Sequence, residues 1–188
     1  FKDRKFAVLG LARSGLSAVR ALVAGGAEVL AWDNDEAARI KVADIATIAD
    51  PLLTDLTGYT AIVVSPGVPI NRHPIADKAK AAGIPLIGDI ELFAMARPNL
   101  PSHRVVGITG TNGKSTTTAL VHHVLESAAI PVRMGGNIGL PILSQEPLPA
   151  GGIYVLELSS YQIDITHSLA CDAAALINLS PDHLDRYD

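Results

Sequence analysis

One stretch, from residue 104 to residue 127, constrains the fold of this chain more than any other. It reads RVVGITGTNGKSTTTALVHHVLES: an apolar run typical of a strand, a glycine-containing loop, and a helical pattern. A strand that runs through a short loop directly into a helix is the opening of a βαβ unit. Because such units build parallel sheets covered by helices, this stretch predicts an α/β fold.

The rest of the chain repeats this alternation of strands and helices. Strand-like apolar runs lie at 5–10, 28–32, 61–67, 84–88, 104–109, 153–158 and 172–179. Helical patterns lie at 14–26, 73–83 and 114–127, and the apolar face of the last one is expected to contain Val121, Val124, Leu125 and Ala128. The segment RPNLPSH (97–103) is rich in proline and polar residues, as domain boundaries are. We therefore predict a Rossmann-like parallel-sheet domain over residues 1–97 and the first part of a P-loop NTPase-like α/β domain over 98–188.

Composition excludes several classes of function. The net charge is −4 and the Lys and Arg residues are scattered, so no basic face indicates binding to nucleic acid or to an anionic membrane. No apolar run is long enough to cross a membrane, and no secretory signal is visible at the start. Cys171 is the only cysteine, so no internal disulfide can form, and we expect it to be a small buried apolar group. A cytoplasmic location is expected.

The loop GTNGKST has the residues that phosphate binding requires. Gly110 and Gly113 allow backbone N–H groups to wrap phosphate oxygens. Lys114 can reach the β- and γ-phosphates of a nucleotide, and the Ser115 hydroxyl can bind Mg²⁺. The loop departs from the strict pattern, because Ile108 stands where a further glycine is usual. The alternative is a glycine-rich turn capped by Thr or Ser.

A single carboxylate interrupts the apolar run at 153–158. Glu157 lies near the end of this expected strand, at the sheet edge where α/β proteins bind ligands. A carboxylate among apolar residues is costly unless it is paired, and beside a phosphate loop Mg²⁺ is the natural partner. A capping box of Ser159 and Gln162 would explain those two residues but not Glu157.

His183 follows the last expected strand, at the same sheet edge. Ser180, Pro181 and Asp182 are typical of the start of a helix, but His183 is not needed for capping. Two interpretations of His183 remain open, a functional histidine and a plain surface histidine. The other histidines are taken as structural or solvent-facing: His103, His122, His123 and His167.

The stretch GLARSG (10–15) is a weaker nucleotide signal in the first half. It follows a strand and opens a helix, as a dinucleotide-binding turn does, but Ala12 replaces the middle glycine. Asp33 ends the next strand, where an acidic residue would hold a ribose. Two interpretations of this stretch remain open. It is either a phosphate-binding turn or a tight turn in which Gly10 and Gly15 allow close packing. The turn at 65–67 would face the same crevice.

Taken together, these motifs resemble those of the Mur ligase family. The matching stretches are SPGVP, GDIELF, GITGTNGKST, GGNIGLP, YVLELSSYQ and LINLSPDHLDRY, and they spread over most of the chain. GDIELF, ELSSYQ and DHLDRY are most similar to the branch of the family that adds D-glutamate to UDP-N-acetylmuramoyl-L-alanine.

The resemblance implies a three-domain ligase and assigns its site residues. The first domain would hold the UDP of the sugar nucleotide, through Arg13, Ser14, Asp33, Ser65, Pro66 and Gly67. The central domain would hold ATP through Thr111, Asn112, Gly113, Lys114, Ser115, Thr116 and Thr117. Ser115 and Glu157 would bind one Mg²⁺ and His183 a second. Asn137 would face substrate and phosphates, with a simple Gly-Asn turn as the alternative.

The implied reaction is the ATP-dependent formation of an amide bond in peptidoglycan synthesis. ATP would phosphorylate the substrate carboxylate, and the amine of D-glutamate would attack the acyl phosphate. The implied enzyme is a monomer. The family's carbamylated lysine and C-terminal domain would lie beyond Asp188. We therefore expect residues 1–188 alone to be inactive.

Two other functions remain open from the sequence. GLARSG and Asp33 would suit an NAD-dependent oxidoreductase, although that reading leaves GTNGKST unused. A non-catalytic module that binds a nucleotide sugar is the second alternative.

Overall fold

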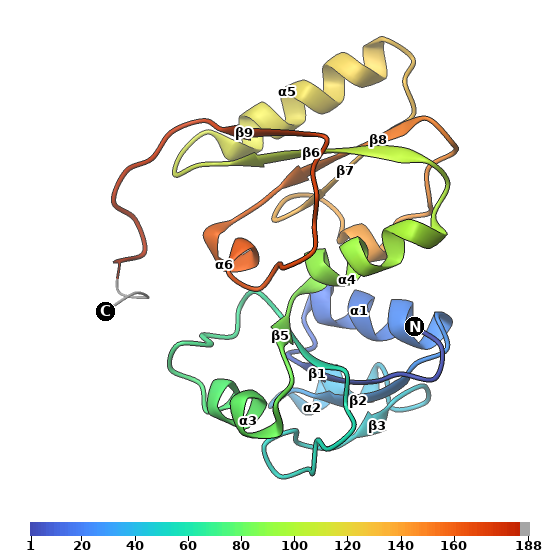
Figure 1. Cartoon of the computed structure of the whole chain (residues 1–188), viewed down its shortest axis with the longest axis vertical. Coiled ribbons are helices and arrows are strands. Elements are labelled where there is room, and N and C mark those ends of the chain that lie inside the picture. The colour runs from blue at the N-terminus through green and yellow to red at the C-terminus, as the bar shows by residue number, and fades with distance from the viewer. Residues whose placement is uncertain (185–188) are drawn as a thin grey trace. The chain divides into compact units, whose positions relative to one another are not determined.

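The computed structural model describes residues 1–184 and divides into two compact units, Phe1–Leu92 and Phe93–Asp188. Each unit is built around its own parallel sheet (Figure 1). The predicted α/β class is therefore confirmed. The predicted domain boundary between residues 97 and 98 stays a prediction.

The first unit has a five-stranded parallel sheet in the order β3-β2-β1-β4-β5. Its strands are β1 (Lys5–Leu9), β2 (Glu28–Trp32), β3 (Thr47–Ile48), β4 (Ala61–Val64) and β5 (Leu86–Ile87), and its helices are α1 (Arg13–Ala24), α2 (Glu36–Ile40) and α3 (Ile75–Ala82). The central strands are buried on both faces, as the continuous apolar runs predict, and Phe6, Leu22 and Ile62 are fully enclosed in the core. Because β1 leads to β2 on one side and β4 lies on its other side, the strand order reverses beside β1.

The second unit has a four-stranded parallel sheet in the order β7-β8-β6-β9. Its strands are β6 (His103–Thr109), β7 (Val132–Gly136), β8 (Gly152–Glu157) and β9 (Ala173–Leu176). The long helix α5 (Lys114–Ser127) lies along one face of this sheet (Figure 1), and α6 (Ser160–Ile163) follows β8. The remaining elements are α4 (Asp89–Ala96) and the short turns η1 (Arg97–Asn99) and η2 (Ile142–Ser144). None of the helices formed by residues 1–184 is long and apolar enough to cross a membrane.

Several predictions for the second unit were wrong. The last strand ends at Leu176 rather than at residue 179, and its four residues are exposed because β9 is the edge strand of the described sheet. On α5, Val124 is 57% exposed and Ala128 is also exposed, so only part of the predicted apolar face packs on the sheet. Residues 180–182 form no helical turn. Cys171 is only partly buried.

Candidate functional site

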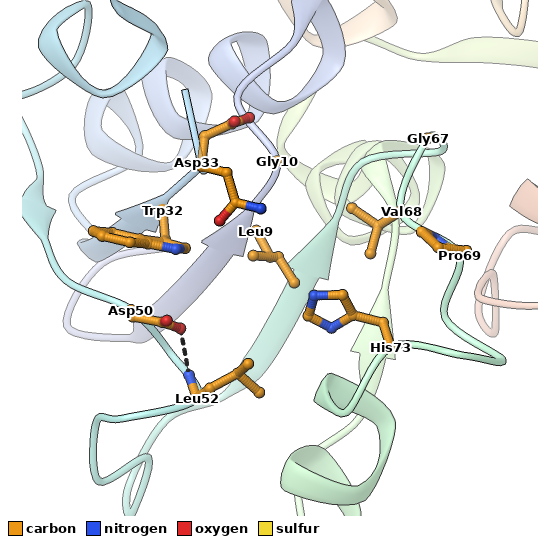
Figure 2. A pocket seen from close by; sticks show the side chains of 11 residues that line it. Leu9, Gly10, Trp32, Asp33, Asp50, Leu52, Gly67, Val68, Pro69 and His73 are labelled. Carbon is orange, nitrogen blue, oxygen red and sulfur yellow. Dashed lines mark hydrogen bonds between the residues drawn. The ribbon is translucent and has the colours of Figure 1, made fainter. Parts of the chain in front are cut away.

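The carboxyl edge of the first sheet carries a cavity of about 220 Å³. It opens where the strand order reverses, which is the usual ligand position in open α/β sheets. Figure 2 shows its lining side chains, which come from the ends of β1 and β2 and from the loops after β3 and β4. The lining residues are Leu9, Gly10, Trp32, Asp33, Asn34, Asp50, Leu52, Gly67, Val68, Pro69 and His73.

Asp33 ties two loops of this cavity together. Its Oδ2 accepts a hydrogen bond of 2.6 Å from the backbone N–H of Leu11, and its Oδ1 accepts one of 2.9 Å from that of Asp35. Both carboxylate oxygens therefore already hold backbone groups. Each oxygen keeps acceptor capacity for a ligand donor such as a ribose hydroxyl.

The turn after β1 is packed so closely that it requires glycine. A Cβ atom on Gly15 would lie 1.8 Å from the carbonyl oxygen of Gly10. That carbonyl also accepts a hydrogen bond of 2.7 Å from the Ser65 hydroxyl, which is buried. The close packing expected of Gly10 and Gly15 is thus present, and the Ser65 hydroxyl is part of it.

Of the predicted sugar-nucleotide residues, Asp33 and Gly67 line this cavity. Arg13 and Ser14 lie at the first turn of α1, with Arg13 exposed, while Ser65 and Pro66 lie in the turn after β4. Which of them contact a ligand stays a prediction.

Sequence reasoning missed Trp32, Asp50 and His73 as lining residues. The guanidinium of Arg39 lies 4.6 Å from the centre of the Trp32 ring and donates hydrogen bonds to the carbonyls of Asp33 and Asn34. Trp32 directly precedes Asp33, so its position at a strand end was a usable signal. No local pattern marks Asp50 or His73, because only the fold brings their segments to the cavity.

The carboxyl edge of the second sheet carries a larger cavity of about 520 Å³. Its walls come from the loops after β6, β7, β8 and β9, so all four strands of the described sheet contribute. Four of the predicted site residues line it, namely Thr111, Lys114, Asn137 and His183.

The phosphate loop runs from Gly110 into α5. Gly113 precedes the helix in the left-handed conformation, with φ of 82°, and the amides of the first helical turn have no acceptor within the helix. The Lys114 ammonium folds back onto the loop and donates to the carbonyls of Gly110 (2.7 Å) and Thr111 (2.9 Å). Ser115 and Thr116 are exposed on this first turn, whereas the Thr117 hydroxyl donates to the Gly113 carbonyl. The arrangement offers free N–H groups and a cation to an anion.

Glu157 ends β8 as a buried carboxylate, 1% exposed. Its Oε1 accepts a hydrogen bond of 2.8 Å from the Asn137 side-chain amide. Within the part of the chain that the structure describes, no hydrogen-bond partner reaches its Oε2. A buried carboxylate oxygen without a donor is costly, which fits a site that a cation completes. The capping box of Ser159 and Gln162 is also present, so both features predicted for this segment exist.

His183 lines the same cavity. Its ring packs edge-on against Tyr161, with ring centres 5.2 Å apart, and Nε2 lies 3.9 Å from a carboxylate oxygen of Asp182. Among residues 1–184, no three His, Cys, Asp or Glu side chains form a cluster suited to a metal ion. Any Mg²⁺ here would therefore need hydroxyl, phosphate or water oxygens beside Glu157.

Comparison with known families accounts for both units. The family model described as "Mur ligase MurD-like, N-terminal domain" matches residues 4–88, and that described as "Mur ligase middle domain" matches residues 108–188. The first of these models spans the five strands of the first sheet, and the second spans β7, β8, β9 and the last two residues of β6.

Curated relatives match the chain over its whole length. It is 72% identical over 188 residues to a UDP-N-acetylmuramoylalanine--D-glutamate ligase of Novosphingobium aromaticivorans, covering 100% of this chain and 42% of that protein. It is 67% identical over 189 residues to the protein of the same name from Sphingopyxis alaskensis, covering 100% of this chain and 44% of that protein. The chain therefore spans less than half the length of these relatives.

Solved structures share the fold at low sequence identity. A UDP-N-acetylmuramate:L-alanyl-gamma-D-glutamyl-meso-diaminopimelate ligase from Neisseria meningitides matches with a TM-score of 0.57 and 18% identity, over 98% of this chain and 63% of that one. A UDP-N-acetylmuramate-alanine ligase from Thermotoga maritima matches with a TM-score of 0.54 and 19% identity, over 97% of this chain and 43% of that one.

Proposed function

Because this chain belongs to the Mur ligase family, we propose that it forms the sugar-nucleotide-binding and ATP-binding parts of a cytoplasmic enzyme that joins D-glutamate to UDP-N-acetylmuramoyl-L-alanine. The similarity along the whole chain to ligases named for this reaction supports the substrate pair. The two matched models are both of Mur ligase domains, so the oxidoreductase alternative has no support.

The reaction divides into two steps. The carboxylate of the alanyl group attacks the γ-phosphorus of ATP, which forms an acyl phosphate and releases ADP. The amine of D-glutamate then attacks the acyl carbon, which forms the amide and releases phosphate and a proton. Activation is needed because a carboxylate is a poor acyl donor, and the acyl phosphate supplies a good leaving group.

Lys114 is the chain's main contribution to the first step. Its ammonium already lies beside the loop carbonyls at the phosphate loop, and it would exchange them for β- and γ-phosphate oxygens. A fixed positive charge there stabilises the charge that builds on the transferring phosphoryl group. The free amides of the first turn of α5 would hold the remaining phosphate oxygens.

Glu157 and Ser115 are suited to one Mg²⁺ ion, with His183 suited to a second. The buried Oε2 of Glu157, which has no donor among the described residues, supports the first of these two sites. When bound, Mg²⁺ would neutralise phosphate charge and orient the γ-phosphate. Asn137 would hold Glu157 in place and present the rest of its amide to the cavity.

The cavity on the first sheet is proposed to hold the uridine diphosphate. The Trp32 ring offers a flat surface for a base, and Asp33 offers acceptors for its donors or for a ribose. Gly67, together with Arg13, Ser14, Ser65 and Pro66, would contact the phosphates. Gly67 leaves open space, since a Cβ atom there would meet nothing within 4 Å.

The single observation that carries the catalytic part of this proposal is the buried, half-satisfied carboxylate of Glu157, which is held by Asn137, a residue that lines the cavity of the phosphate loop. To test it, this chain should replace the matching part of the Novosphingobium aromaticivorans ligase, and ADP release should be followed with a coupled assay. The hybrid is expected to release ADP only when UDP-N-acetylmuramoyl-L-alanine, D-glutamate and Mg²⁺ are all present. A hybrid that folds and binds both nucleotides but shows no D-glutamate-dependent turnover would contradict the proposal.

A further inference from the structure

We propose that Asn178 is a positioning residue that holds the phosphate loop in its ATP-binding conformation. This inference deepens the proposed function and rests on it, because it concerns the same ATP site. Asn178 lies in the segment after β9, 66 residues from the loop it would hold.

The side chain of Asn178 forms a two-way contact with the backbone of Asn112. Its Oδ1 accepts a hydrogen bond of 2.9 Å from the Asn112 N–H, and its Nδ2 donates one of 2.7 Å to the Asn112 carbonyl. One side-chain amide thus fixes both peptide groups that flank Asn112. Only Asn or Gln offers a donor and an acceptor in this arrangement.

The neighbouring residue is held by the same segment. The backbone N–H of Thr111 donates to the Asn178 carbonyl at 3.2 Å. The Thr111 hydroxyl donates to the Ser180 carbonyl (3.0 Å) and accepts from the Ser180 N–H (2.9 Å). Five hydrogen bonds therefore join Thr111 and Asn112 to the segment 178–180.

The loop also packs tightly against this segment. Gly110 has φ of 144°, which disfavours any other residue, and a Cβ atom there would lie 2.7 Å from Ile177 Cγ1 and 3.0 Å from the Asn178 carbonyl oxygen. The loop therefore rests directly on the backbone of residues 177 and 178.

This contact decides which amides can bind phosphate. The N–H groups of Thr111 and Asn112 are used in holding the loop, so they are not free for a ligand. The amides that remain are those from Gly113 through the first turn of α5. Fixing the peptide groups before Gly113 removes conformational freedom that ATP binding would otherwise have to remove.

The same segment continues to His183, five positions after Asn178 in the chain. The contact therefore links the phosphate loop to the segment that carries the proposed ligand of the second Mg²⁺. Asn112 is exposed, so water competes for these bonds and the expected effect is moderate.

The experiment measures MgATP binding to the 188-residue chain by calorimetry, and steady-state kinetics in the hybrid ligase, for Asn178→Ala and Asn178→Leu. Asn178→Leu keeps the side-chain volume without either hydrogen bond, and it answers the question if the alanine variant does not fold. Asn99→Ala is the matched control, because Asn99 is an exposed asparagine in η1, away from the loop.

Loss of the two side-chain bonds is expected to raise the Kd for MgATP about tenfold. In the hybrid, KM for ATP should rise by a similar factor while kcat changes less than about twofold. The reason is that the loop conformation held by Asn178 would stabilise bound ATP and the transition state equally. KM for UDP-N-acetylmuramoyl-L-alanine and all values for Asn99→Ala should stay unchanged.

An unchanged Kd and KM for ATP in both variants would overturn the inference, as would a loss of kcat with KM for ATP unaltered. A wild-type chain that does not bind MgATP would overturn it as well. If the wild-type chain binds MgATP but the hybrid shows no D-glutamate-dependent turnover, the ligase proposal fails while the calorimetry still decides the role of Asn178.

Discussion

Asn137 contacts Glu157 through both its side chain and its backbone. Its Nδ2 donates to Glu157 Oε1 at 2.8 Å, and its backbone N–H donates to the Glu157 carbonyl at 2.9 Å. The pair joins the end of β7 to the end of β8, so the position of a buried carboxylate is set by an amide on the neighbouring strand. Two consequences of this pair can be measured directly.

Replacing Glu157 by Gln is expected to abolish catalysis without harming the fold. The variant keeps an acceptor for Asn137 but removes a buried charge whose second oxygen has no donor among the described residues. We expect turnover of the hybrid ligase to fall at least about a hundredfold, and the Tm without Mg²⁺ to stay equal or rise. Glu146→Gln, at an exposed position, is the control. Retained turnover in Glu157→Gln would contradict the proposed role of Glu157 as a Mg²⁺ ligand.

Removal of the Asn137 side chain should make stability depend on Mg²⁺. Asn137→Ala removes the side-chain amide that donates to Glu157 Oε1, so this buried oxygen loses its hydrogen bond. The loss should lower the free energy of unfolding by about 1–3 kcal/mol. Mg²⁺ should restore part of the lost Tm, since a cation can replace the missing donor. Thermal scans with Mg²⁺ and with K⁺ at equal ionic strength distinguish specific binding from screening. Equal recovery in both salts would count against a Mg²⁺ site.

Trp32 provides an intrinsic probe of the first cavity. It is the only tryptophan of the chain and it lines that cavity. Titration with UDP-N-acetylmuramoyl-L-alanine should change its fluorescence, whereas MgATP, which is expected at the other sheet, should not. NADH is the informative competitor, because strong displacement of the sugar nucleotide by NADH would favour the oxidoreductase alternative.

Gly15→Ala should damage the first cavity selectively. The added Cβ would lie 1.8 Å from the Gly10 carbonyl oxygen, so the turn after β1 has to move. We expect loss of the Trp32 response to the sugar nucleotide and a destabilisation of about 1–3 kcal/mol, as overpacking costs. Gly67→Ala is the matched control for stability, because its Cβ would meet open space. Wild-type sugar-nucleotide affinity in Gly15→Ala would show that the close packing is dispensable.

Cys171 should make stability fall at alkaline pH. Burial raises the pKa of its thiol above the ordinary value of 9.0, while Arg97 lowers it and Asp172 raises it to smaller extents. Because the folded-state pKa is the higher one, the folded chain binds the proton more tightly than the unfolded chain. Stability from this group is therefore complete below about pH 9 and is lost as the pH rises through the folded-state pKa. Urea midpoints across this range should fall more for the wild type than for Cys171→Ser, and parallel curves would contradict the prediction.

Local sequence patterns determined much of the fold and of the second site. Continuous apolar runs identified β1, β2, β4, β6 and β8, because strands buried on both faces need apolar residues throughout. The glycines and Lys114 of the phosphate loop and the carboxylate of Glu157 were visible because each breaks the pattern of its surroundings. The phosphate loop follows β6 and Glu157 ends β8, and both ends lie at the carboxyl edge of one parallel sheet. The proximity of the loop and Glu157 therefore followed once a parallel sheet was predicted.

Other elements were invisible because they are short or lack a strong pattern. β3 has two residues, and β7 (VRMGG) contains an arginine and two glycines, so neither forms an apolar run. β9 was predicted too long, and it was expected to be buried, because apolar residues alone do not distinguish an edge strand from a central one. Only the pairing of strands settles that difference.

What the sequence determined by itself is the chemistry that each strand end can offer: a lysine in a glycine loop, an acid in an apolar strand, an acid after β2. What only the tertiary structure decided is which distant groups complete these ends. Asn178 reaches Asn112 across 66 residues, and His73 and Asp50 meet Trp32 at one cavity. The physical reason is that hydrogen bonds and cavities depend on positions in space, and the order of strands in a sheet, which sets those positions, is not written in any local pattern.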